Sequence, residues 1–373
     1  MHILYNIAGF YRPAGMERVL ADKANWLASN GHKVTIVTTE QKGRPAAFPL
    51  NERISHIDLA IGYEDNNGSS LMDKLIHYPG KQRRHRKALE KILKELRPDI
   101  AISMFCNEVN ILPRIKDGSH KLLEVHFSRH KRLQYDRKGL WKIVDRIRSK
   151  QDERLVHKYE RFVVLTQEDK SNWGDSGNIR VIPNPVNFCP EQPASLDSNS
   201  VVFVGRYSHQ KSPDRLIEAW NMIKDKRGWK LHLVGDGELR RALENQIARL
   251  CLTDSVVLGR NESNMAEVYN NASILALASR YEGLPMALLE CQAFGVPAVA
   301  FDCKCGPREI IKDGNTGFLV KEGDISGLAA AIEKLMQDKH LRKEMGLNAF
   351  QNAESWRPED IMPKWIDLFE EIL

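Results

Sequence analysis

The sequence has few cysteines, no long apolar run and no basic leader. Its six cysteines are scattered, and the close pair among them has no second pair of Cys or His residues at zinc spacing. This pattern predicts reduced core cysteines in a cytosolic protein rather than a disulfide framework or a metal site. No stretch reaches the roughly 20 apolar residues of a membrane span, so we expect neither a transmembrane helix nor a signal peptide. The cysteines are Cys106, Cys189, Cys251, Cys291, Cys303 and Cys305.

Two nucleotide-binding signals are also missing. Neither of the first strand-to-helix turns reads Gly-X-Gly-X-X-Gly, which disfavours a dinucleotide-dependent dehydrogenase. The basic clusters lack interleaved aromatic residues and a base-reading motif, which disfavours a nucleic-acid-binding protein. A non-enzymatic basic binding protein stays open as an alternative to an enzyme.

The net charge of +6 is unevenly divided along the chain. Residues 1–183 carry 33 Lys and Arg against 22 Asp and Glu, whereas residues 184–373 carry 22 against 27. The excess is concentrated in Lys81–Lys87 and between Arg129 and Lys150. Such a basic face is typical of a protein that meets a phosphorylated acceptor, an anionic membrane surface or nucleic acid. The alternative is a solvated helix face.

Apolar strands alternate with amphipathic helices along most of the chain. This alternation predicts parallel sheets, and 373 residues exceed the usual size of a single core. The double-proline segment Ile182–Val186 interrupts the pattern and cannot be helical. We therefore predict two doubly wound α/β domains, residues 1–183 and 184–355. Strands are expected at 2–8, 34–38, 99–103, 121–125, 161–165, 200–205, 230–235, 256–259, 273–277 and 297–301, and helices at 19–27, 212–223, 239–250, 265–270 and 286–294.

The most informative pattern consists of two glutamates, Glu282 and Glu290, that lie eight positions apart. A Gly-X-Pro turn follows the first, and a helix is predicted from Met286 onward. The free amides at the helix start then point outward, where the helix dipole favours an anion. Amides that bind phosphates and carboxylates that bind hydroxyl groups suit a sugar nucleotide. A solvated loop followed by a helix with surface charge is the alternative.

A second group of charged residues follows the strand at 200–205. Arg206 and Lys211 come just after its carboxyl end, where ligands bind in doubly wound sheets. They are therefore placed to hold an anion such as a diphosphate. The turn Gly235–Gly237 ends the next strand, and the alternative for its Asp236 is an Asx turn or a helix N-cap.

Together these motifs resemble glycosyltransferase family 4, the retaining nucleotide-sugar transferases with two facing Rossmann-like domains of the GT-B architecture. The resemblance extends from about Ile3 to Trp365 and rests on the order and spacing of several motifs. The matching segments are Ala14–Arg18, Ile182–Val186, Val204–Lys211, Val234–Gly237, Leu258–Arg260 and Glu282–Glu290.

The resemblance implies a role for each matching residue. Arg206 and Lys211 grip the donor diphosphate, Glu290 binds the ribose hydroxyls, and Glu282 faces the transferred sugar. His126 lies near the donor sugar and the attacking hydroxyl. The implied catalytic residues are His126, Glu282, Arg206 and Lys211, and the implied nucleotide-sugar-binding residues are Gly15, Arg206, Lys211, Arg260, Gly283, Leu284, Met286 and Glu290.

Two positions depart from the family pattern. Ala14 stands where the family often has a glycine, and its methyl group restricts φ and crowds the approach to the donor. Glu124 lies two residues before His126 instead of one, on the same side of the strand, and we assign it no part in the site. Without the family match, a lone histidine after an apolar strand is interpreted as structural. The surface residues expected are His130 and His209, and the packing residues expected are Trp141 and Trp173.

The implied reaction is retaining, metal-independent transfer of a sugar from a nucleotide diphosphate sugar, with a UDP-sugar favoured, to an acceptor hydroxyl. Positive side chains and helix-start amides stabilise the charge that grows on the diphosphate. The sequence contains no Asp-X-Asp, and we expect neither a metal nor a cofactor. Front-face attack is favoured because no carboxylate is placed for a double displacement. A GT-B nucleotide-sugar epimerase, which needs no acceptor, is the main alternative.

The resemblance also implies a cellular setting. The acceptor is a carbohydrate or a lipid-linked saccharide in the assembly of cell-surface polysaccharide, lipopolysaccharide or glycolipid. The protein is expected in the cytoplasm, at the inner face of the cytoplasmic membrane, where its basic face meets anionic lipid. No nucleic-acid partner is expected.

The chain end, residues 356–373, is predicted to form an amphipathic helix. In the family the last helix returns to the N-terminal domain, here through Trp356, Trp365 and Phe369. Pro363 is expected to kink or restart this helix. The two chain crossings, at residues 183–185 and before Trp356, are expected to act as a hinge.

Overall fold

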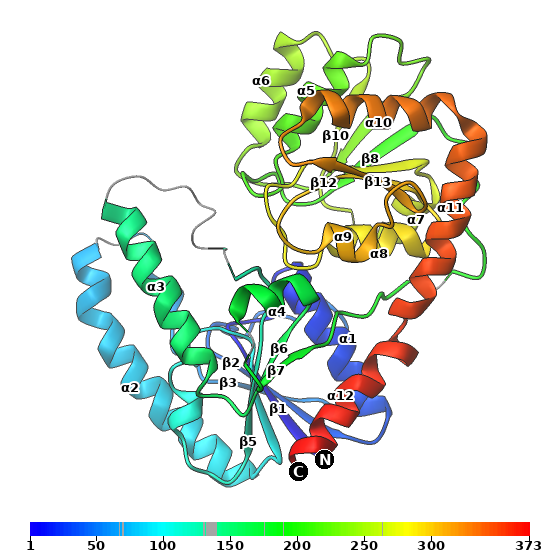
Figure 1. Ribbon diagram of the computed structural model, residues 1–373. Coiled ribbons are helices and arrows are strands. Elements are labelled where there is room, and N and C mark those ends of the chain that lie inside the picture. The colour runs from blue at the N-terminus through cyan, green and yellow to red at the C-terminus, as the bar shows by residue number, and fades with distance from the viewer. Residues whose placement is uncertain are drawn as a thin grey trace. The chain divides into compact units, whose positions relative to one another are not determined.

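The computed structural model describes residues 1–66, 68, 71–129, 131, 140–174, 176–188, 190–262 and 264–373. The chain divides into two compact units, one of residues 1–182 with 361–373 and the other of residues 183–360. Each unit contains one parallel sheet with helices packed on it (Figure 1). This confirms the predicted α/β architecture and the return of the chain end to the first unit.

The first unit has seven parallel strands in the order β3-β2-β1-β4-β5-β6-β7. The central strand β1 (His2–Ile7) is buried throughout because its two faces belong to different cores. Tyr5 points into the core shared with α1 and α12, and Leu4 points into the core shared with α2. The other elements are β2 (Lys33–Thr38), β3 (Ser55–Asp58), β4 (Ile100–Ser103), β5 (His120–Glu124), β6 (Arg161–Val164), β7 (Ile179–Val181), α1 (Gly15–Ser29), α2 (Leu71–Leu96), α3 (Leu140–Val156), α4 (Gln167–Trp173), most of α12 (Pro358–Ile372), and the 3-10 turns η1 (Tyr63–Asn66) and η2 (Leu112–Arg114).

The second unit has six parallel strands in the order β10-β9-β8-β11-β12-β13. Its central strands β8 and β11 are apolar and largely buried, as the sequence predicts. The elements are β8 (Ser200–Val204), β9 (Lys230–Val234), β10 (Val256–Leu258), β11 (Ile274–Leu277), β12 (Ala298–Asp302), β13 (Gly317–Lys321), α5 (Pro213–Met222), α6 (Arg240–Arg249), α7 (Met265–Asn270), α8 (Met286–Ala293), α9 (Pro307–Ile310), α10 (Ile325–Gln337), α11 (Lys339–Ala353) and the 3-10 turn η3 (Glu354–Trp356).

Each sheet has one place where the strand order reverses. β1 and β4 are neighbours in the first sheet, β8 and β11 are neighbours in the second, and later strands add outward from each pair in opposite directions. Doubly wound folds bind ligands at the carboxyl edge of the sheet at such a switch point. A site is therefore expected at the loops after β8 and β11, and at the loops after β1 and β4.

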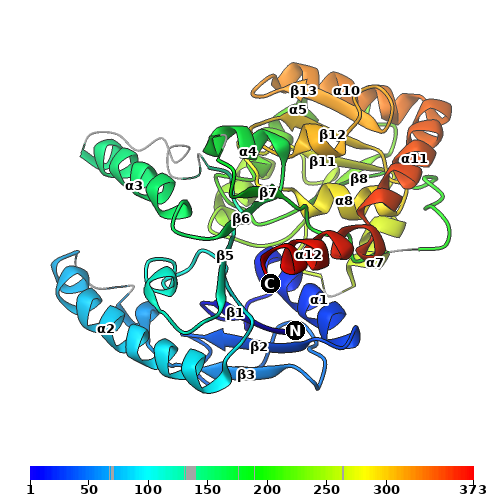
Figure 2. The same cartoon turned by 60° about the horizontal axis from the view of Figure 1, so that its bottom comes forward.

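The C-terminal helix α12 packs beside α1 in the first unit (Figure 2). Trp365 and Phe369 are buried there, as predicted. Pro363 lies inside α12, so the helix does not restart there. A proline at this position removes the one helical hydrogen bond that its amide would donate to the carbonyl of Glu359. Trp356 differs from the prediction, since it lies in the second unit, where its carbonyl accepts a hydrogen bond from the amide of Val186 at 2.7 Å.

Three strands and six helices were not predicted from the sequence, and one cysteine differs from its expected place. The six helices are α2, α3, α4, α9, α10 and α11. The strands β3, β7 and β13 all lie at sheet edges and are only partly buried. Polar residues interrupt β3 and β7, whereas the apolar run Phe318–Val320 of β13 is short and was not predicted. Cys251 is exposed in the turn after α6 and is not a core residue. Cys189 lies outside the described residues.

Candidate functional site

The loops after β8 and β11 meet at the switch point of the second sheet. Lys211, in the first loop, donates from Nζ to both carboxylate oxygens of Glu282 at 2.6 and 2.8 Å. Gln210 joins the loops again, because its side chain donates to the carbonyl of Tyr281 at 3.1 Å. Two residues that the sequence predicts separately are therefore in direct contact. The Glu282 side chain is 5% exposed and that of Lys211 is 21% exposed.

The turns after β8 and β9 pack backbone against backbone. The amide of Gly205 donates to the carbonyl of Val234 at 3.0 Å. A Cβ atom at Gly235 would lie 2.0 Å from the carbonyl oxygen of Gly205, and one at Gly237 would lie 2.4 Å from that of Tyr207. Only glycine fits these two positions, and the carboxyl edge of the sheet is fixed by their close approach.

Arg240 of α6 supports these turns. Its Nε donates to Oδ1 of Asp236 at 2.8 Å, and the same oxygen accepts the amide of Gly237 at 2.8 Å. Asp236 therefore stabilises its own turn, which agrees with the alternative interpretation. Arg240 was not predicted from the sequence, although a cation four residues after an aspartate at a helix start is typical of such a pair.

Helix α8 begins without a side-chain cap. Its N-cap is Pro285, which has no polar side-chain atom, so no side chain of that residue satisfies the first amides of the helix. Amides left in this way favour an anion. Gly283 and Met286 are partly exposed and Leu284 is buried. The predicted phosphate-binding amides thus directly follow Glu282 at the switch point.

Glu290 lies inside α8, where it is 5% exposed. Tyr269 of α7 donates its hydroxyl to Oε2 of Glu290 at 2.5 Å, and its ring lies 5.7 Å from that of Phe294. The hydrogen bond from a fixed ring orients the carboxylate. No spacing rule could have found Tyr269, because it belongs to a different element.

Arg206 and Arg260 are exposed at the ends of β8 and β10. The carbonyl of Arg260 accepts the amide of Gly235 at 3.1 Å, so its main chain belongs to the same hydrogen-bonded edge. Both residues are therefore exposed at the carboxyl edge of the sheet. His209, in the loop after β8, is exposed as predicted.

In the first unit, helix α1 begins in the loop after β1. Gly15 is its exposed first residue. Apart from its chain neighbours and the backbone of its own helix, no atom of the described residues lies within 4 Å of the position that a Cβ atom would take there. Ala14 is the N-cap, with φ −123° and ψ 166°. This extended conformation is available to any residue, so the predicted restriction at Ala14 does not strain the loop.

His126 follows β5 and belongs to a buried charged cluster. Its Nε2 lies 2.9 Å from Oε1 of Glu124. Lys23 of α1 donates to both oxygens of Glu124 at 2.5 and 2.6 Å. Burial would raise the pKa of Glu124, but Lys23 and His126 outweigh it and lower the pKa to about 2. Glu124 therefore contacts His126 directly, as its place on the same side of the strand allows.

Lys23 has a recognisable signal that the sequence analysis missed. It lies three residues after Leu20 and four before Leu27, which places it on the apolar face of the predicted helix. Lysine is almost never fully buried unless it is paired, so a lysine at such a position predicts a buried acidic partner.

The loop after β4 contains a second buried carboxyl group, that of Glu108. Its Oε1 accepts the hydroxyl of Ser103 at 2.6 Å and the amide of Cys106 at 3.1 Å. Burial raises the pKa of Glu108 to about 7, although the Ser103 hydrogen bond acts in the opposite direction. No sequence pattern marks this residue.

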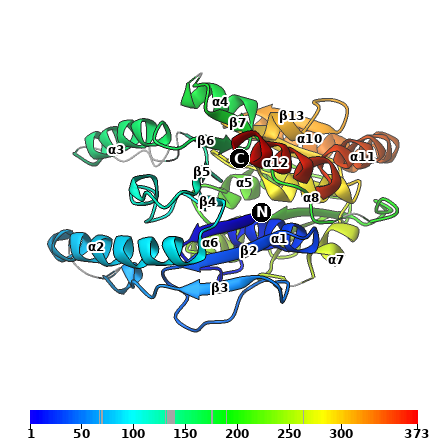
Figure 3. The same cartoon turned by 90° about the horizontal axis from the view of Figure 1, so that it is seen from below.

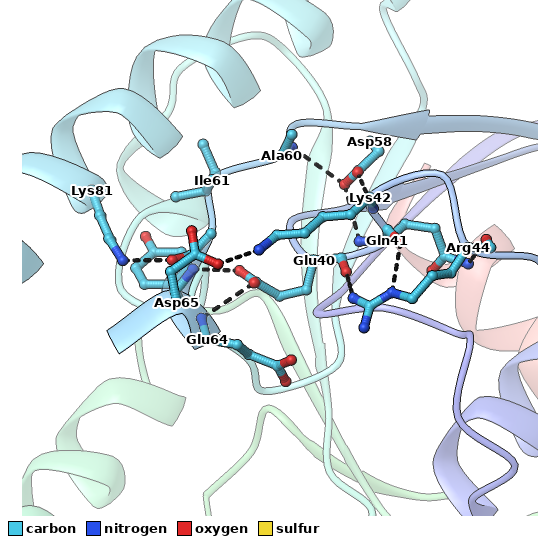
Figure 4. A network of polar contacts seen from close by, with 12 residues as sticks. Glu40, Gln41, Lys42, Arg44, Asp58, Ala60, Ile61, Glu64, Asp65 and Lys81 are labelled. Carbon is cyan, nitrogen blue, oxygen red and sulfur yellow. Dashed lines mark hydrogen bonds and ion pairs between the residues drawn. The ribbon is translucent and has the colours of Figure 1, made fainter. Parts of the chain in front are cut away.

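A polar network fixes the loops after β2 and β3 (Figure 4). Glu40 accepts two amides at the start of η1 at 2.6 and 3.2 Å, and Asp58 accepts the amide of Lys42 at 2.7 Å. Gln41 accepts the amide of Phe10 at 3.0 Å. The network therefore also supports the loop after β1, at the switch point of the first sheet.

The predicted basic clusters fall largely on α2 and α3, which extend from the first sheet toward the same side (Figure 3). Both helices also expose apolar side chains, with Ile76 69%, Ile143 55% and Ile147 52% exposed. His130 and residues 132–139 lie outside the described residues. The exposed cations are Arg83, Arg84, Arg86 and Lys87 on α2 and Arg146, Arg148 and Lys150 on α3.

Within the described ranges, there is no cluster of three or more His, Cys, Asp or Glu side chains that could hold a metal ion. Nor is any helix in that part of the chain long and apolar enough to span a membrane.

Trp173 packs against Phe162 with ring centres 5.0 Å apart, as predicted. The side chain of Trp141 lies outside the described part.

Several known proteins similar to this chain are glycosyltransferases. The amylovoran biosynthesis glycosyltransferase AmsD of Erwinia amylovora is 37% identical over 220 residues, which are 56% of this chain and 62% of that protein. The GalNAc-α-(1→4)-GalNAc-α-(1→3)-diNAcBac-PP-undecaprenol α-1,4-N-acetyl-D-galactosaminyltransferase of Campylobacter jejuni is 29% identical over 374 residues, covering 96% of this chain and 95% of that protein. The chain thus spans less than two thirds of the Erwinia relative.

The fold matches a solved structure, and the sequence matches two family models. A mutant of S. aureus TarM in complex with Fondaparinux, α-GlcNAc-glycerol and UDP superposes with a TM-score of 0.80 at 16% identity, covering 99% of both chains. The model of Glycosyltransferase Family 4 matches residues 13–188, and the model of Glycosyl transferases group 1 matches residues 189–352. The two matches adjoin and follow the two units, so the chain belongs to the family of glycosyltransferases that these models describe.

Proposed function

We propose that this protein is a retaining glycosyltransferase that moves a sugar from a UDP-sugar to a hydroxyl group of a saccharide acceptor. The observation that carries the proposal is the Lys211–Glu282 pair at the switch point of the second sheet, directly before the uncapped start of α8. A carboxylate, a partly exposed ammonium group and free helix amides are the groups that a sugar diphosphate needs.

Each part of the donor has a partner in this proposal. Glu290, oriented by Tyr269, accepts the ribose hydroxyls. Arg206, Lys211 and the amides of α8 stabilise the charge that develops on the diphosphate. Glu282 receives hydroxyl groups of the transferred sugar while Lys211 holds its carboxylate in place. UDP in the complex of the structurally similar TarM supports a uridine nucleotide as the donor part.

The proposed reaction is independent of metal and retains the anomeric configuration. The cations take the role of a divalent ion, and the leaving phosphate accepts the proton of the attacking hydroxyl on the same face of the sugar. The undecaprenol-linked substrate in the name of the Campylobacter relative, and the polysaccharide in that of the Erwinia relative, support a lipid-linked saccharide acceptor in surface polysaccharide assembly. We place the enzyme in the cytoplasm, at the membrane surface.

A panel of UDP-, GDP- and ADP-sugars tests the donor class. The cognate nucleotide sugar at 100 times its Kd should stabilise the protein by about 2.7 kcal/mol. With a saccharide acceptor and EDTA, product should form and keep the anomeric configuration of the donor. Conversion of the donor without an acceptor would instead indicate the epimerase. Activity that is lost in EDTA and restored by a divalent ion would contradict metal independence.

A further inference from the structure

The chain enters the second unit through residues 183–188, which contact helix α8 at both of its ends. The side-chain amide of Asn184 donates to Sδ of Met286, the first residue of α8, at 3.7 Å. At the other end of the helix, the ring of Phe188 lies 5.5 Å from that of Phe294, the C-cap residue. This entry segment is therefore packed against the helix that begins at the predicted phosphate-binding amides.

Phe188 belongs to a group of three aromatic rings that contact one another. Its ring lies 6.1 Å from that of Tyr269, and the rings of Tyr269 and Phe294 are 5.7 Å apart. These separations, like the 5.5 Å between Phe188 and Phe294, lie in the range in which aromatic pairs attract each other. Tyr269 is 0% exposed, and Phe188 is half-buried. The Tyr269 ring is thus packed against one ring from the entry segment and one from the end of α8.

The hydroxyl of Tyr269 connects the position of this ring to the carboxylate of Glu290. It donates to Oε2 of Glu290 at 2.5 Å, and Glu290 is 5% exposed. A carboxylate has several lone pairs and only accepts hydrogen bonds, so Glu290 can keep this donor and accept ribose hydroxyls as well. Because the hydroxyl is rigidly attached to the ring, a shift of the ring moves the donor to which Glu290 is bound.

We propose that Phe188 is a positioning residue for the nucleotide, because it fixes the Tyr269 ring, which in turn directs the Glu290 carboxylate toward the ribose hydroxyls. The assignment of the ribose to Glu290 rests on the proposed function. The segment through which the chain enters the second unit thereby contributes to nucleotide affinity without touching the nucleotide.

Two nucleotides separate this role from a general contribution to packing. UDP carries both ribose hydroxyls, whereas 2′,3′-dideoxy-UDP carries neither. A misdirected Glu290 carboxylate should therefore lower the affinity for UDP and leave the affinity for the dideoxy nucleotide unchanged. A loss of packing in the unit would lower both affinities.

Titration calorimetry of the full chain measures both affinities in the wild type, Phe188→Leu, Tyr269→Phe and the double variant. Tyr269→Phe keeps the ring and removes the hydroxyl, whereas Phe188→Leu keeps an apolar side chain and removes the ring. We expect Tyr269→Phe to weaken UDP binding by about tenfold, since hydrogen bonds between the ribose and a charged group are impaired, and Phe188→Leu to weaken it by less. Because Phe188 acts through the Tyr269 hydroxyl, the double variant should bind UDP no more weakly than Tyr269→Phe alone.

The matched control is Phe318→Leu, which changes another half-buried phenylalanine of the second unit, on β13 with Lys334 5.0 Å from its ring centre. It should change neither affinity. Equal losses of UDP and 2′,3′-dideoxy-UDP affinity in Phe188→Leu, or losses of UDP affinity that add in the double variant, would overturn the inference and leave the proposed donor intact. No binding of UDP to the wild type would refute the proposed donor and, with it, the role of Phe188.

Discussion

At the scale of single residues, the carboxyl groups of this protein differ mainly in their partners. Glu124 and Glu108 are both buried, yet the pKa of the first is lowered to about 2 and that of the second is raised to about 7. Glu124 faces Lys23 and His126, whereas Glu108 accepts only neutral donors in its described contacts. At Glu124, the neighbouring positive charges therefore outweigh the effect of burial on the pKa. At Glu108, the described contacts include no positive charge, and burial raises the pKa.

Glu108 should make the stability of the protein depend on pH. Its folded-state pKa is raised to about 7 from 4.5, so the folded chain holds this proton more tightly than the unfolded chain. The contribution of this proton to the free energy of unfolding is fully present below pH 4.5. It is lost as the pH rises to 7, so the free energy of unfolding falls by on the order of 3 kcal/mol. Glu108→Gln does not titrate and keeps an acceptor for Ser103.

Chemical denaturation of the wild type and Glu108→Gln between pH 4.5 and 8 measures this effect. As the pH rises, the free energy of unfolding of the wild type should fall relative to that of the variant. The difference between the two should become constant above pH 7. A difference that is constant over this range would show that the carboxyl group of Glu108 has no raised pKa.

At the scale of secondary-structure elements, α3 combines the features of a membrane-surface helix. Ile143 and Ile147 are more than half exposed and lie one turn apart, among the exposed cations Arg146, Arg148 and Lys150. An apolar stripe flanked by Lys and Arg binds anionic lipid by burying apolar area and by charge attraction. This arrangement supports the proposed location at a membrane surface.

Serine at both Ile143 and Ile147 should weaken binding to phosphatidylglycerol vesicles by about tenfold or more, since each isoleucine contributes up to about 1.5–3 kcal/mol when buried. Sedimentation measures the binding, which should also decrease as salt rises. The matched control carries serine at Met222 and Leu347, which are similarly exposed in the second unit. Equal losses in both variants, or equal binding to neutral vesicles, would contradict the role of α3.

At the scale of the whole molecule, the chain end completes the core of the first unit. Trp365 is 1% exposed and packs with Phe369 against α1 and β1. Trp365→Ala should destabilise the first unit by about 3–5 kcal/mol, because the change leaves a large cavity and removes the ring over Lys23.

Calorimetry with and without UDP can assign this loss to one unit. The transition that Trp365→Ala lowers should differ from the transition that UDP raises, because we propose that the nucleotide binds the second unit. A variant in which both transitions fall equally would show that α12 does not belong energetically to the first unit.

The order of elements was largely predictable from the sequence, because buried parallel strands are continuous apolar runs. β1, β8 and β11 are such runs, whereas the edge strand β3 is polar and half-exposed and carries no such signal. The helix was expected to kink or restart at Pro363, and it does not restart, because a proline near a helix start removes only one helical hydrogen bond.

The candidate site was predictable only in part. Glu282 and Lys211 follow strand ends and could be assigned to one edge, and their direct contact depends on the neighbouring order of β8 and β11. The contact of Lys23 with Glu124 joins residues 101 positions apart. The partner of a buried charge is set by tertiary packing, which no local spacing encodes.

We propose that the switch point of the second sheet binds a nucleotide diphosphate sugar. Titration calorimetry with UDP tests it on the wild type, Glu290→Ala and Glu282→Ala, with Glu333→Ala on α10 as a control that changes a glutamate elsewhere in the same unit. Thermal unfolding shows whether each variant is folded, since Glu290→Ala leaves the hydroxyl of Tyr269 without this acceptor.

UDP should bind the wild type and Glu333→Ala equally well. Glu290→Ala should weaken UDP binding by about tenfold or more, because hydrogen bonds to a charged group contribute about 1.5–3 kcal/mol. Glu282→Ala should weaken it much less, because the sugar that Glu282 faces is missing from UDP. No binding of UDP to the wild type, or equal losses in Glu290→Ala and Glu282→Ala, would contradict the claim.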